Sequence, residues 1–470
     1  MIEHFPFEKI LKEALRGGGE FADLYFEQNR STVIVFEEDR IEKVISGLDI
    51  GMGLRVLFGR RTIYSFTNQI TEEVLFDLAR KISRVVKEDG EEKVIRLIHH
   101  PQASFPKPLV RESSFPVKRN PKDISIEEKI SMVKRANDLV RRLDPHVRQV
   151  KVLYRDVGQI LSVADSEGAL TEGERIGTVF SVQVVSAKGD AIQAGYEPVG
   201  GTVGFELFDL YPPEQVAEVA TKRSLLMLSA RKAPMGRMSV VLSSEAGGTM
   251  IHEAIGHGLE ADLAQEGLSV YSGKIGESVA SSLITVVDDP TLPHQRGSYA
   301  FDDEGVPSQK TLLVEEGVLK GYLYDRLTAL KDGVRSTGNG RRESYQHKPI
   351  PRMSNTMILP GKMRPEEIIH SVEKGLLVRK MGGGQVNTVN GDFVFEVSEG
   401  YLIERGSVAE PVRGAILTGN GPQVLKEIDR VGDDLGFGIG TCGKDGQGVP
   451  VADAQPTLRI PDLVVGGQQN

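Results

Sequence analysis

One segment of this 470-residue chain constrains its fold more than any other. It holds His252 and His257, with Glu253 directly after the first histidine, in a stretch that otherwise predicts a helix. Two imidazoles and a carboxylate at such a spacing are what a zinc hydrolase needs, because the carboxylate can act as a base beside a metal-bound water. The common zincin motif H-E-x-x-H places its histidines four residues apart, whereas these are five apart.

The five-residue spacing carries a geometric requirement. On an ideal α-helix, positions i and i+5 differ by roughly 140° around the axis, so the two imidazoles would point apart. A single widened turn of π-helical type returns both positions to one face, and such turns occur often at functional sites. Gly256 and Gly258 stand where the backbone has to deform, which glycine tolerates best. We therefore expect a widened or kinked helix over 254–256; the alternative is two unrelated histidines.

A third metal ligand has to come from elsewhere in the chain. Cys442 is the only cysteine, and its glycine neighbours could bring a thiolate to an ion through a sharply turned backbone. Glu260, Asp262 and His294 are the other candidates. A lone cysteine is also compatible with a small buried hydrophobic residue. The residues by themselves leave the third ligand open.

Charge and hydropathy exclude several classes of function. The formal net charge of −9, from 57 basic and 66 acidic residues, predicts no dedicated nucleic-acid surface. No apolar run approaches the roughly 18 residues that a membrane-spanning helix needs, and the N-terminus lacks the profile of a signal peptide. One cysteine cannot form a disulfide within the chain. We expect a cytoplasmic protein that binds neither membrane nor nucleic acid.

The hydrophobic pattern predicts an α+β fold. In residues 1–232 the order helix, strands, helix occurs twice, with a Pro-rich linker at about 101–122, which suggests a duplicated unit. The predicted helices are 7–16, 71–86, 125–143 and 212–230, and the predicted strands are 24–28, 32–37, 41–46, 53–58, 62–66, 150–154, 159–165, 177–187 and 191–197. We expect both units to pack against the remainder of the chain.

Residues 233–470 predict a β-rich catalytic domain that carries the histidine helix and the Cys442 loop. A strand at 239–242 leads into that helix, and short strands with few helices follow. Sixteen glycines lie between Gly382 and Gly448, interleaved with apolar residues such as Phe393 and Phe395. This mixture favours tight turns in an ordered structure over disorder.

Other polar patterns are less specific. Gly438, Gly440 and Gly443 match a dinucleotide-binding spacing, but residues 446–450 cannot begin the helix that would hold a phosphate, so we expect no nucleotide site. Two charged loops contain Tyr299 and, further along, Arg341, Tyr345 and His347. These side chains could stabilise an oxyanion or hold a substrate carboxylate, although such loops are more often solvated surface.

The segments 252–262 and 442–451 together resemble the TldD/PmbA family, and the resemblance extends nearly end to end. Within the family the chain resembles the metal-bearing TldD type rather than the TldE (PmbA) type, which lacks the H-E-x-x-x-H motif. The resemblance implies a cytoplasmic zinc metallopeptidase that acts on small unfolded peptides as a heterodimer with a TldE-type paralogue. It implies His252, His257 and Cys442 as zinc ligands and Glu253 as the catalytic carboxylate.

Two alternatives stay open. An older label of the same family implies a regulatory protein that acts on gyrase or a toxin–antitoxin system, with a structural metal. The other alternative is a cysteine hydrolase that uses Cys442 with a histidine base. Glu253 favours the metallopeptidase, because a structural metal site has no use for a carboxylate beside an open coordination position. In a strand-rich domain, an extended peptide could add to a sheet edge through backbone hydrogen bonds.

Overall fold

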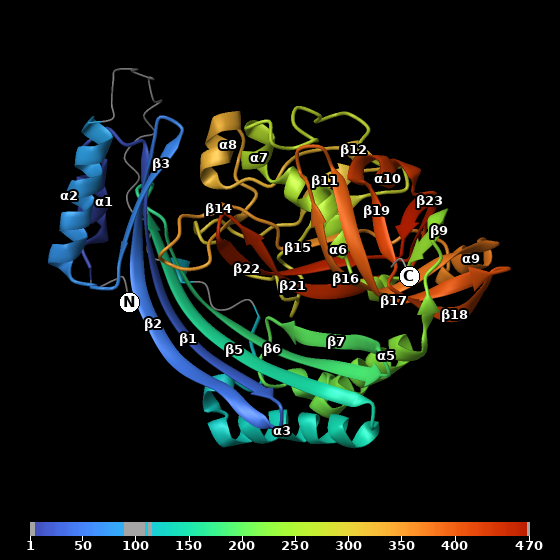
Figure 1. Ribbon diagram of the computed structural model, residues 1–470. Helices are drawn as coiled ribbons and strands as arrows, with labels where there is room; N and C mark the ends of the chain where they lie inside the picture. Colours follow the sequence, from blue (N-terminus) through green and yellow to red (C-terminus); the bar gives the residue numbers. More distant parts are fainter. Residues whose placement is uncertain (1–4, 89–108, 111–114, 468–470) are drawn as a thin grey trace.

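A large curved sheet and a β-rich second part that lies in its concavity make up the molecule (Figure 1). This computed structural model describes residues 5–88, 109–110 and 115–467. The predicted α+β class is confirmed, since long helices and strands alternate in the first half and strands dominate the second. Within the described ranges, no helix combines the length and the apolar character needed to cross a membrane.

The first half builds a single seven-stranded sheet. Its strands run in the order β3, β2, β1, β5, β6, and both β4 and β7 pair with β6. β1 joins the two halves of the sheet, because it pairs with β5 from Asp23↔Asp165 to Glu37↔Lys151. The strands are β1 (Phe21–Glu37), β2 (Arg40–Phe58), β3 (Arg61–Thr67), β4 (Leu109–Val110), β5 (Val147–Asp165), β6 (Leu170–Lys188) and β7 (Ala191–Gly201).

Three of these strands are longer than the hydrophobic pattern predicts. The expected pairs 24–28 and 32–37, 41–46 and 53–58, and 150–154 and 159–165 are wrong as separate strands, because each pair forms one continuous strand. Polar residues such as those at 29–31 interrupt the alternation and mimic a turn. They stay in β1 because β2 and β5 hydrogen-bond to it on both sides.

The predicted linker at about 101–122 is described only in part. Residues 101–108 and 111–114 lie outside the described residues. Leu109–Val110 pairs in parallel with β6, and Pro121–Asp123 forms a short 3₁₀ helix whose cap is the Asn120 side chain. The segment therefore includes an added strand of the sheet.

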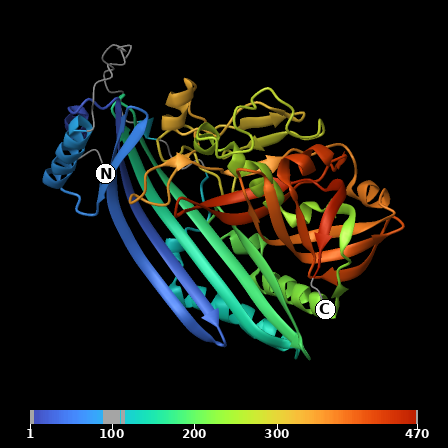
Figure 2. The same cartoon turned by 45° about the horizontal axis from the view of Figure 1, so that its top comes forward.

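Four helices cover one face of the sheet in two pairs (Figures 1 and 2). Leu24 and Phe26 of β1 pack against the first pair, and Ile34 and Phe36 against the second. Successive strand residues point to opposite faces, so Tyr25 packs instead against Phe301 and Tyr345 of the second half. The helices are α1 (Phe7–Leu15), α2 (Glu72–Glu88), α3 (Ile126–Leu143) and α5 (Pro213–Ser229), with the short α4 (Leu207–Leu210) before α5.

The second half contains an eight-stranded sheet in which five strands close into a ring. Each of β9, β23, β19, β17 and β16 pairs with the next, and β16 pairs back with β9. The strands of this sheet are β8 (Arg231–Lys232), β9 (Gly236–Leu242), β16 (Lys374–Val386), β17 (Asp392–Glu404), β18 (Ser407–Arg413), β19 (Ile416–Asn420), β20 (Arg430–Val431) and β23 (Leu458–Gly466). The glycine-rich stretch is thus ordered, as predicted.

A second, six-stranded sheet ends in the hairpin that carries Cys442. Its strands follow in the order β12 (Val318–Leu319), β11 (Thr311–Glu315), β10 (Val286–Asp288), β15 (Asn355–Ile358), β22 (Gln447–Gln455) and β21 (Gly436–Lys444). The remaining elements are the small pair β13 (Gly340–Arg341) and β14 (Ile350–Pro351) and the helices α6 (Thr249–Ile251), α7 (Ala261–Gln265), α8 (Arg326–Asp332), α9 (Pro365–His370) and α10 (Gly421–Glu427). Strand β21 therefore forms the edge next to the site.

The histidine segment is held in the largest hydrophobic core. Ile251, Ala254 and Ile255 are buried there among side chains of the strand ring, including Leu376 and Phe395. Because its apolar residues are fixed in this core, the segment presents its histidines on the remaining side, toward β21 and β22. Burial of this kind sets the orientation of the two imidazoles before any ligand binds.

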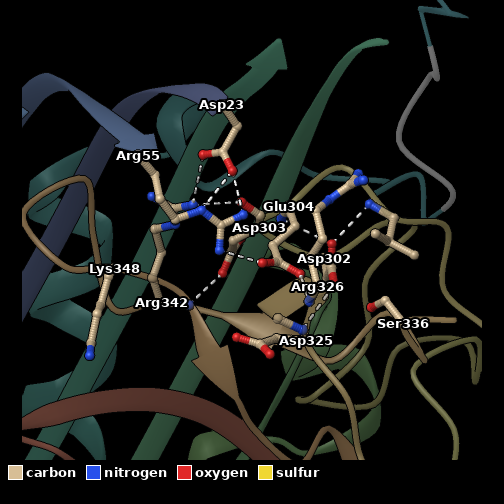
Figure 3. A network of polar contacts seen from close by, with 12 residues as sticks. Asp23, Arg55, Asp302, Asp303, Glu304, Asp325, Arg326, Ser336, Arg342 and Lys348 are labelled. Carbon is tan, nitrogen blue, oxygen red and sulfur yellow. Dashed lines mark hydrogen bonds and ion pairs between the residues drawn. The ribbon is translucent and has the colours of Figure 1, made fainter. Parts of the chain in front are cut away.

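A buried ionic network joins the curved sheet to the second half (Figure 3). Arg55 of β2 is fully buried and binds Asp23 of β1 and Glu304 of the second half. Glu304 also accepts a hydrogen bond of 2.7 Å from the backbone N–H of Arg326, whose guanidinium pairs with Asp165 of β5 at 3.3 Å. These contacts cross between segments far apart in the chain.

Candidate metal centre

The helix around the histidines contains the widened turn that their spacing requires. His252–Gly256 forms a π-helical turn, in which the backbone N–H of His257 donates to the carbonyl oxygen of His252. The two imidazole rings lie perpendicular, with centroids 4.9 Å apart. The predicted deviation from a regular helix is confirmed, and both side chains face one volume.

The two glycines of this segment are required by close packing rather than by an unusual backbone conformation. Gly256 has φ −54° and ψ −57°, an ordinary right-handed helical conformation. A Cβ at this position would lie 2.1 Å from Sδ of Met353, and one at Gly258 would lie 2.7 Å from the Tyr271 ring. The expectation that glycine eases a backbone deformation here is wrong at Gly256. Close approach of neighbouring side chains is what requires the missing Cβ.

Three potential ligands converge at this turn. One donor atom each from His252, His257 and Cys442 lie within 4.8 Å of one another. Sγ of Cys442 lies 3.4 Å from Nε2 of His257, although 185 residues separate the two in the chain. Cys442 comes from edge strand β21, and its side chain is 4% exposed. Two nitrogens and one thiolate sulfur form a donor set that zinc accepts readily.

Each imidazole is oriented by a carboxylate behind it. Nδ1 of His252 lies 2.7 Å from Oδ1 of Asp453, and Nδ1 of His257 lies 3.0 Å from Oε2 of Glu260. A carboxylate on Nδ1 fixes the tautomer that leaves Nε2 free to bind a metal. The donor set together with these two outer carboxylates fits a zinc ion held by His252, His257 and Cys442.

The other candidate ligands take different places. Glu260 is fully buried and binds His257 through the outer nitrogen, with Lys444 Nζ 3.1 Å away. Asp262 pairs with the same Lys444 at 2.7 Å. His294 lies near the carbonyl oxygen of Thr202, away from the three converging residues. Among the candidates for third ligand, only Cys442 belongs to the cluster.

Asp453 was missed in the sequence, although a signal was present. It lies on β22 among buried Val451, Ala452 and Ala454 and is itself 9% exposed. An acidic residue within an apolar strand has to be paired or bound when that strand is buried. The partner, His252, lies 201 residues away in the chain, so only the fold could identify it.

Electrostatics favour an ionised cysteine in this cluster. Burial opposes ionisation of the Cys442 thiol, but hydrogen bonds and positive charge from His252 and His257 outweigh it and lower the pKa to about 5. Burial acts against the charged form of His257, yet Glu260 and the thiolate raise its pKa to about 10. Glu260 stays ionised despite its burial, because Lys444 and His257 lower its pKa to about 2. Negative charge therefore gathers around the two imidazoles, as a cation site requires.

Glu253 lies beside the converging ligands in an open cavity. A volume of about 540 Å³ is lined by Glu253, by the three ligand candidates and by residues of β16, β21 and β22. Burial raises the pKa of the Glu253 carboxyl, while the charges of His252 and His257 act in the opposite direction. A carboxylate with a raised pKa next to a metal site is suited to accept and return a proton.

The four loop residues predicted as softer candidates lie elsewhere. Tyr299 and Arg341 line a second cavity on the side of the curved sheet. The Tyr345 hydroxyl donates to Asp49 at 3.2 Å, and Nδ1 of His347 lies 3.1 Å from the Ser344 hydroxyl. None of the four lines the cavity that holds Glu253, so the structure does not bring them together with the three converging residues.

The glycine pattern at residues 438–443 is part of a β-hairpin. Gly438, Gly440 and Gly443 all lie in strand β21, which pairs with β22 through Lys444↔Gln447. A phosphate-binding turn needs a helix after the glycines, and a strand follows here. The expectation that this motif is unrelated to nucleotide binding agrees with the fold.

Comparison with known proteins places nearly the whole chain in one family. Residues 22–88, 119–228 and 235–467 match the PmbA/TldA metallopeptidase domain 1, central domain and C-terminal domain, respectively. A metalloprotease TldD homolog from Haemophilus influenzae is 37% identical over 95% of this chain and 93% of its own length. A zinc metalloprotease TldD homolog from Saccharolobus solfataricus is 29% identical over 98% of this chain and 99% of its own length.

Solved structures share the fold. A Thermotoga maritima protein, described as a candidate modulator of a DNA gyrase, aligns with a TM-score of 0.79 and 22% identity over 99% of this chain and 100% of its own. TldE from Thermococcus kodakarensis aligns with a TM-score of 0.75 and 19% identity over 98% of this chain and 100% of its own. From the matched domains and the metalloprotease relatives it follows that the chain belongs to the PmbA/TldD family of metallopeptidases.

Proposed function

We propose that this protein is a zinc-dependent metallopeptidase that hydrolyses small unfolded peptides. In this proposal His252, His257 and Cys442 hold the zinc ion and Glu253 is the catalytic carboxylate. The observation that carries it is the convergence of the three donor atoms within 4.8 Å beside an open cavity that Glu253 lines. A purely structural site would need neither the cavity nor the adjacent carboxylate.

Each residue of the proposed site has its own role in peptide hydrolysis. When bound, zinc supplies a Lewis acid that polarises a peptide carbonyl and acidifies a water molecule. Glu253 accepts a proton from the attacking water and returns it to the leaving amine. Asp453 and Glu260 hold the Nδ1 atoms of the two imidazoles, which leaves each Nε2 free to bind an ion.

Replacing Glu253 tests the assignment. Glu253→Ala removes the proton acceptor and leaves the three ligands in place, so peptide cleavage should fall roughly 10²–10⁴-fold, while zinc content and thermal stability stay near those of the parent protein. Metal analysis and a peptidase assay on the same preparation measure both. Normal cleavage by this variant contradicts the mechanism; absence of zinc from the parent protein contradicts the metal site. Inhibition by thiol reagents but not by chelators would favour the cysteine hydrolase.

We also propose that substrates pair with the free edge of β21. This strand is the last of its sheet, and its residues 439–443 line the metal cavity. Pro450 lies opposite Thr441, has no N–H, and directs its carbonyl oxygen at Arg341. The backbone groups of Thr441 therefore point away from β22, toward a strand that could join the edge. Only an extended chain could do so, which excludes folded proteins.

Backbone methylation tests this mode of binding. A cleavable peptide and its singly N-methylated analogues keep the same side chains but lose one N–H donor each. Under strand pairing, methylation at every second position should weaken cleavage, because alternate N–H groups face the strand edge. Equal sensitivity at all positions, or none, argues against pairing with β21.

For the partner, we propose that a TldE-type paralogue covers the free edge of β2. Residues 40–49 of β2 pair with β1 only, since β3 begins its pairing at Met52. Ile41, Val44, Ile45 and Leu48 on this edge are 42–51% exposed. An apolar, unpaired edge invites strand addition or aggregation unless another chain covers it. Ile45→Lys should abolish the copurification of the two proteins, whereas Ile192→Lys, at an exposed site on β7, should not.

We propose that residues 233–470 act as the metallopeptidase domain and residues 1–232 as the region that forms one wall of its substrate cleft.

We further propose that the protein works in the cytoplasm, because a thiolate ligand has to stay reduced. Cys442 is the only thiol of the chain, so oxidising conditions should lower zinc content in the purified protein, and reductant should restore it.

A further inference from the structure

A second cavity, of about 240 Å³, lies between the curved sheet and the hairpin β21–β22. The proposed peptidase mechanism makes no use of it. Strands β5 and β6 form one wall, and Thr441, Gly448 and Pro450 of the hairpin form the other. We name it the arginine cavity, because five arginines line it: Arg155, Arg175, Arg296, Arg341 and Arg342.

The acidic residues of the arginine cavity are already engaged. Asp303 binds Arg175 at 2.6 Å and accepts a hydrogen bond from the backbone N–H of Arg342. Glu343 accepts a hydrogen bond of 2.6 Å from the backbone N–H of Gly448. These two carboxylates are the acidic residues of the lining. Because five guanidinium groups line the same cavity, its walls carry more positive than negative charge.

Three of the arginines have no carboxylate partner among the residues that the structure describes. Arg341 is 4% exposed and donates to the carbonyl oxygens of Met353 and Pro450. Arg296 donates to the carbonyl oxygen of Gly440 at 3.0 Å, and Arg155 lies exposed on β5. Burying a cation without a counter-ion is costly. Burial lowers the pKa of Arg296 to about 10, and the charges of Arg155 and Arg341 act in the same direction.

The arginine cavity and the metal cavity lie on opposite faces of one hairpin. Cys442 and Val451 line the metal cavity and not the arginine cavity, whereas Thr441 and the residue opposite it, Pro450, line the arginine cavity. Thr441 also borders the metal cavity. The free edge of β21 therefore runs between the two cavities.

A peptide strand along β21 would present alternate side chains to these two faces. We infer that the arginine cavity is a carboxylate-binding subsite, which takes an acidic group of a peptide substrate whose neighbouring residue lies at the metal. Its ligand is a carboxylate, from a Glu or Asp side chain or from the C-terminus of the peptide. Charge-assisted pairing with guanidinium groups is strong and geometrically specific. This inference rests on the proposed peptidase function and on pairing along β21.

Pairs of peptides that differ by one carboxylate distinguish binding of an acidic side chain from binding of the C-terminus. A cleavable peptide is made with Glu or Gln at each position in turn, and each version with a free or an amidated C-terminus. With the zinc-loaded protein, Glu should raise kcat/KM by roughly tenfold over Gln at one position if a side chain is bound. A similar gain from the free C-terminus over the amide identifies the terminal carboxylate. Equal rates for all versions overturn the inference.

Arginine variants link the preference to the cavity. Arg155→Gln should reduce the Glu-to-Gln ratio, and Arg155→Glu should reverse it in favour of a Lys peptide. Arg84→Gln, at an exposed position on α2, is the matched control and should keep the parental ratio. Arg155 is solvent-exposed, so its replacement should preserve the fold, which a melting curve verifies. A preference that survives both Arg155 variants overturns the assignment.

A binding test stands apart from peptidase activity. Glutarate, a small dicarboxylate, should raise the melting temperature of the parent protein relative to chloride at equal ionic strength, and should do so less in Arg155→Gln. If no peptide is cleaved but this shift occurs, the peptidase proposal fails while the carboxylate site stands. If peptides are cleaved, but glutarate does not raise the melting temperature and no carboxylate is preferred, the carboxylate-binding subsite is contradicted and the peptidase proposal stands.

Discussion

At the scale of single residues, the proposed metal centre depends on two carboxylates outside the proposed ligand set. Asp453 and Glu260 each hold the outer nitrogen of one histidine, at 2.7 and 3.0 Å. Glu260 is in turn held by Lys444 and lies 3.8 Å from Arg352. Such outer partners fix ring orientation and increase the basicity of the ligand. The two histidines are therefore preorganised by side chains outside the His252–Gly256 turn.

Removing one of these carboxylates should weaken metal binding. Asp453→Asn is expected to lower zinc affinity by roughly 10–100-fold, because His252 loses the charged group that orients its ring. Competition with a chromophoric chelator measures the affinity. Asp445→Asn, on the exposed turn of the same hairpin, is the control and should retain parental affinity. Equal affinities for both variants would show that Asp453 has no part in metal binding.

Metal removal should expose a reactive thiolate. Burial disfavours ionisation of Cys442, but the neighbouring imidazoles lower its pKa to about 5, so in chelator-treated protein the thiol is ionised at pH 6–8. Its alkylation by iodoacetamide should vary little over that range, whereas in urea-unfolded protein the rate should rise with pH. Added zinc should block the reaction. A strong pH dependence in folded, metal-free protein would contradict the lowered pKa.

At the scale of elements, the π turn brings the two histidines together. Its buried side shows how the extra residue is accommodated: Gly256 faces Met353, which is fully buried, and the Tyr271 hydroxyl donates to the carbonyl oxygen of Ala254 at 2.9 Å. A widened turn leaves backbone groups without their usual partners, and the tyrosine satisfies one of them. The turn is supported by its neighbours as well as by its own hydrogen bonds.

A methyl group at position 256 should destabilise this packing. Gly256→Ala would place Cβ 2.1 Å from Sδ of Met353, and overpacking of this kind costs about 1–3 kcal/mol. Urea unfolding measures the change. In a Met353→Ala background the cost should largely disappear, and Gly47→Ala, where a Cβ meets no atom within 4 Å, serves as control. A cost that persists without Met353 would point to the backbone instead.

At the scale of the whole molecule, the ionic network determines how the two halves are held together. Arg55, Asp23 and Glu304 are all fully buried or nearly so, and Figure 3 shows them together with Asp325 and Arg326. Breaking a buried ion pair leaves an uncompensated charge, which is why such networks specify one arrangement. This arrangement places strands β5 and β6 opposite the hairpin that carries Cys442.

The network should make stability depend on pH. Burial, and then the charge of Glu304, raise the pKa of Asp325 to about 7, so the folded state binds a proton that the unfolded state has released. This contribution is present below the ordinary carboxyl pKa and is lost as pH rises through about 7. We expect the free energy of unfolding to fall by at least about 1 kcal/mol across this window, measured by urea titration.

An asparagine at this position isolates the effect. Asp325→Asn keeps a good helix cap for α8 but cannot titrate, so its stability should decline less between pH 5 and 8. Asp190→Asn, on the exposed turn between β6 and β7, should follow the parent protein. If Asp325→Asn retains the full decline, another group of the network is responsible.

Much of the fold was predictable from local patterns, but strand length and sheet membership were not. The helices 71–86 and 125–143 agree closely with α2 and α3, since each has an apolar face of regular period. The strands were predicted too short, because polar residues interrupt the alternation and pairing on both sides of β1 continues across them. Local propensity has no information about such pairing.

Sequence alone determined the π turn: two histidines five residues apart can share an ion only if the helix widens, because side-chain direction on a helix follows from residue count. It also proposed Glu253 as the catalytic carboxylate and Cys442 as a candidate third ligand. Only the tertiary structure decided which distant residue meets His257, that Asp453 lies behind His252, and that an arginine-lined cavity lies across the hairpin. These depend on contacts between segments about 200 residues apart, where side-chain position follows from the packing of whole sheets.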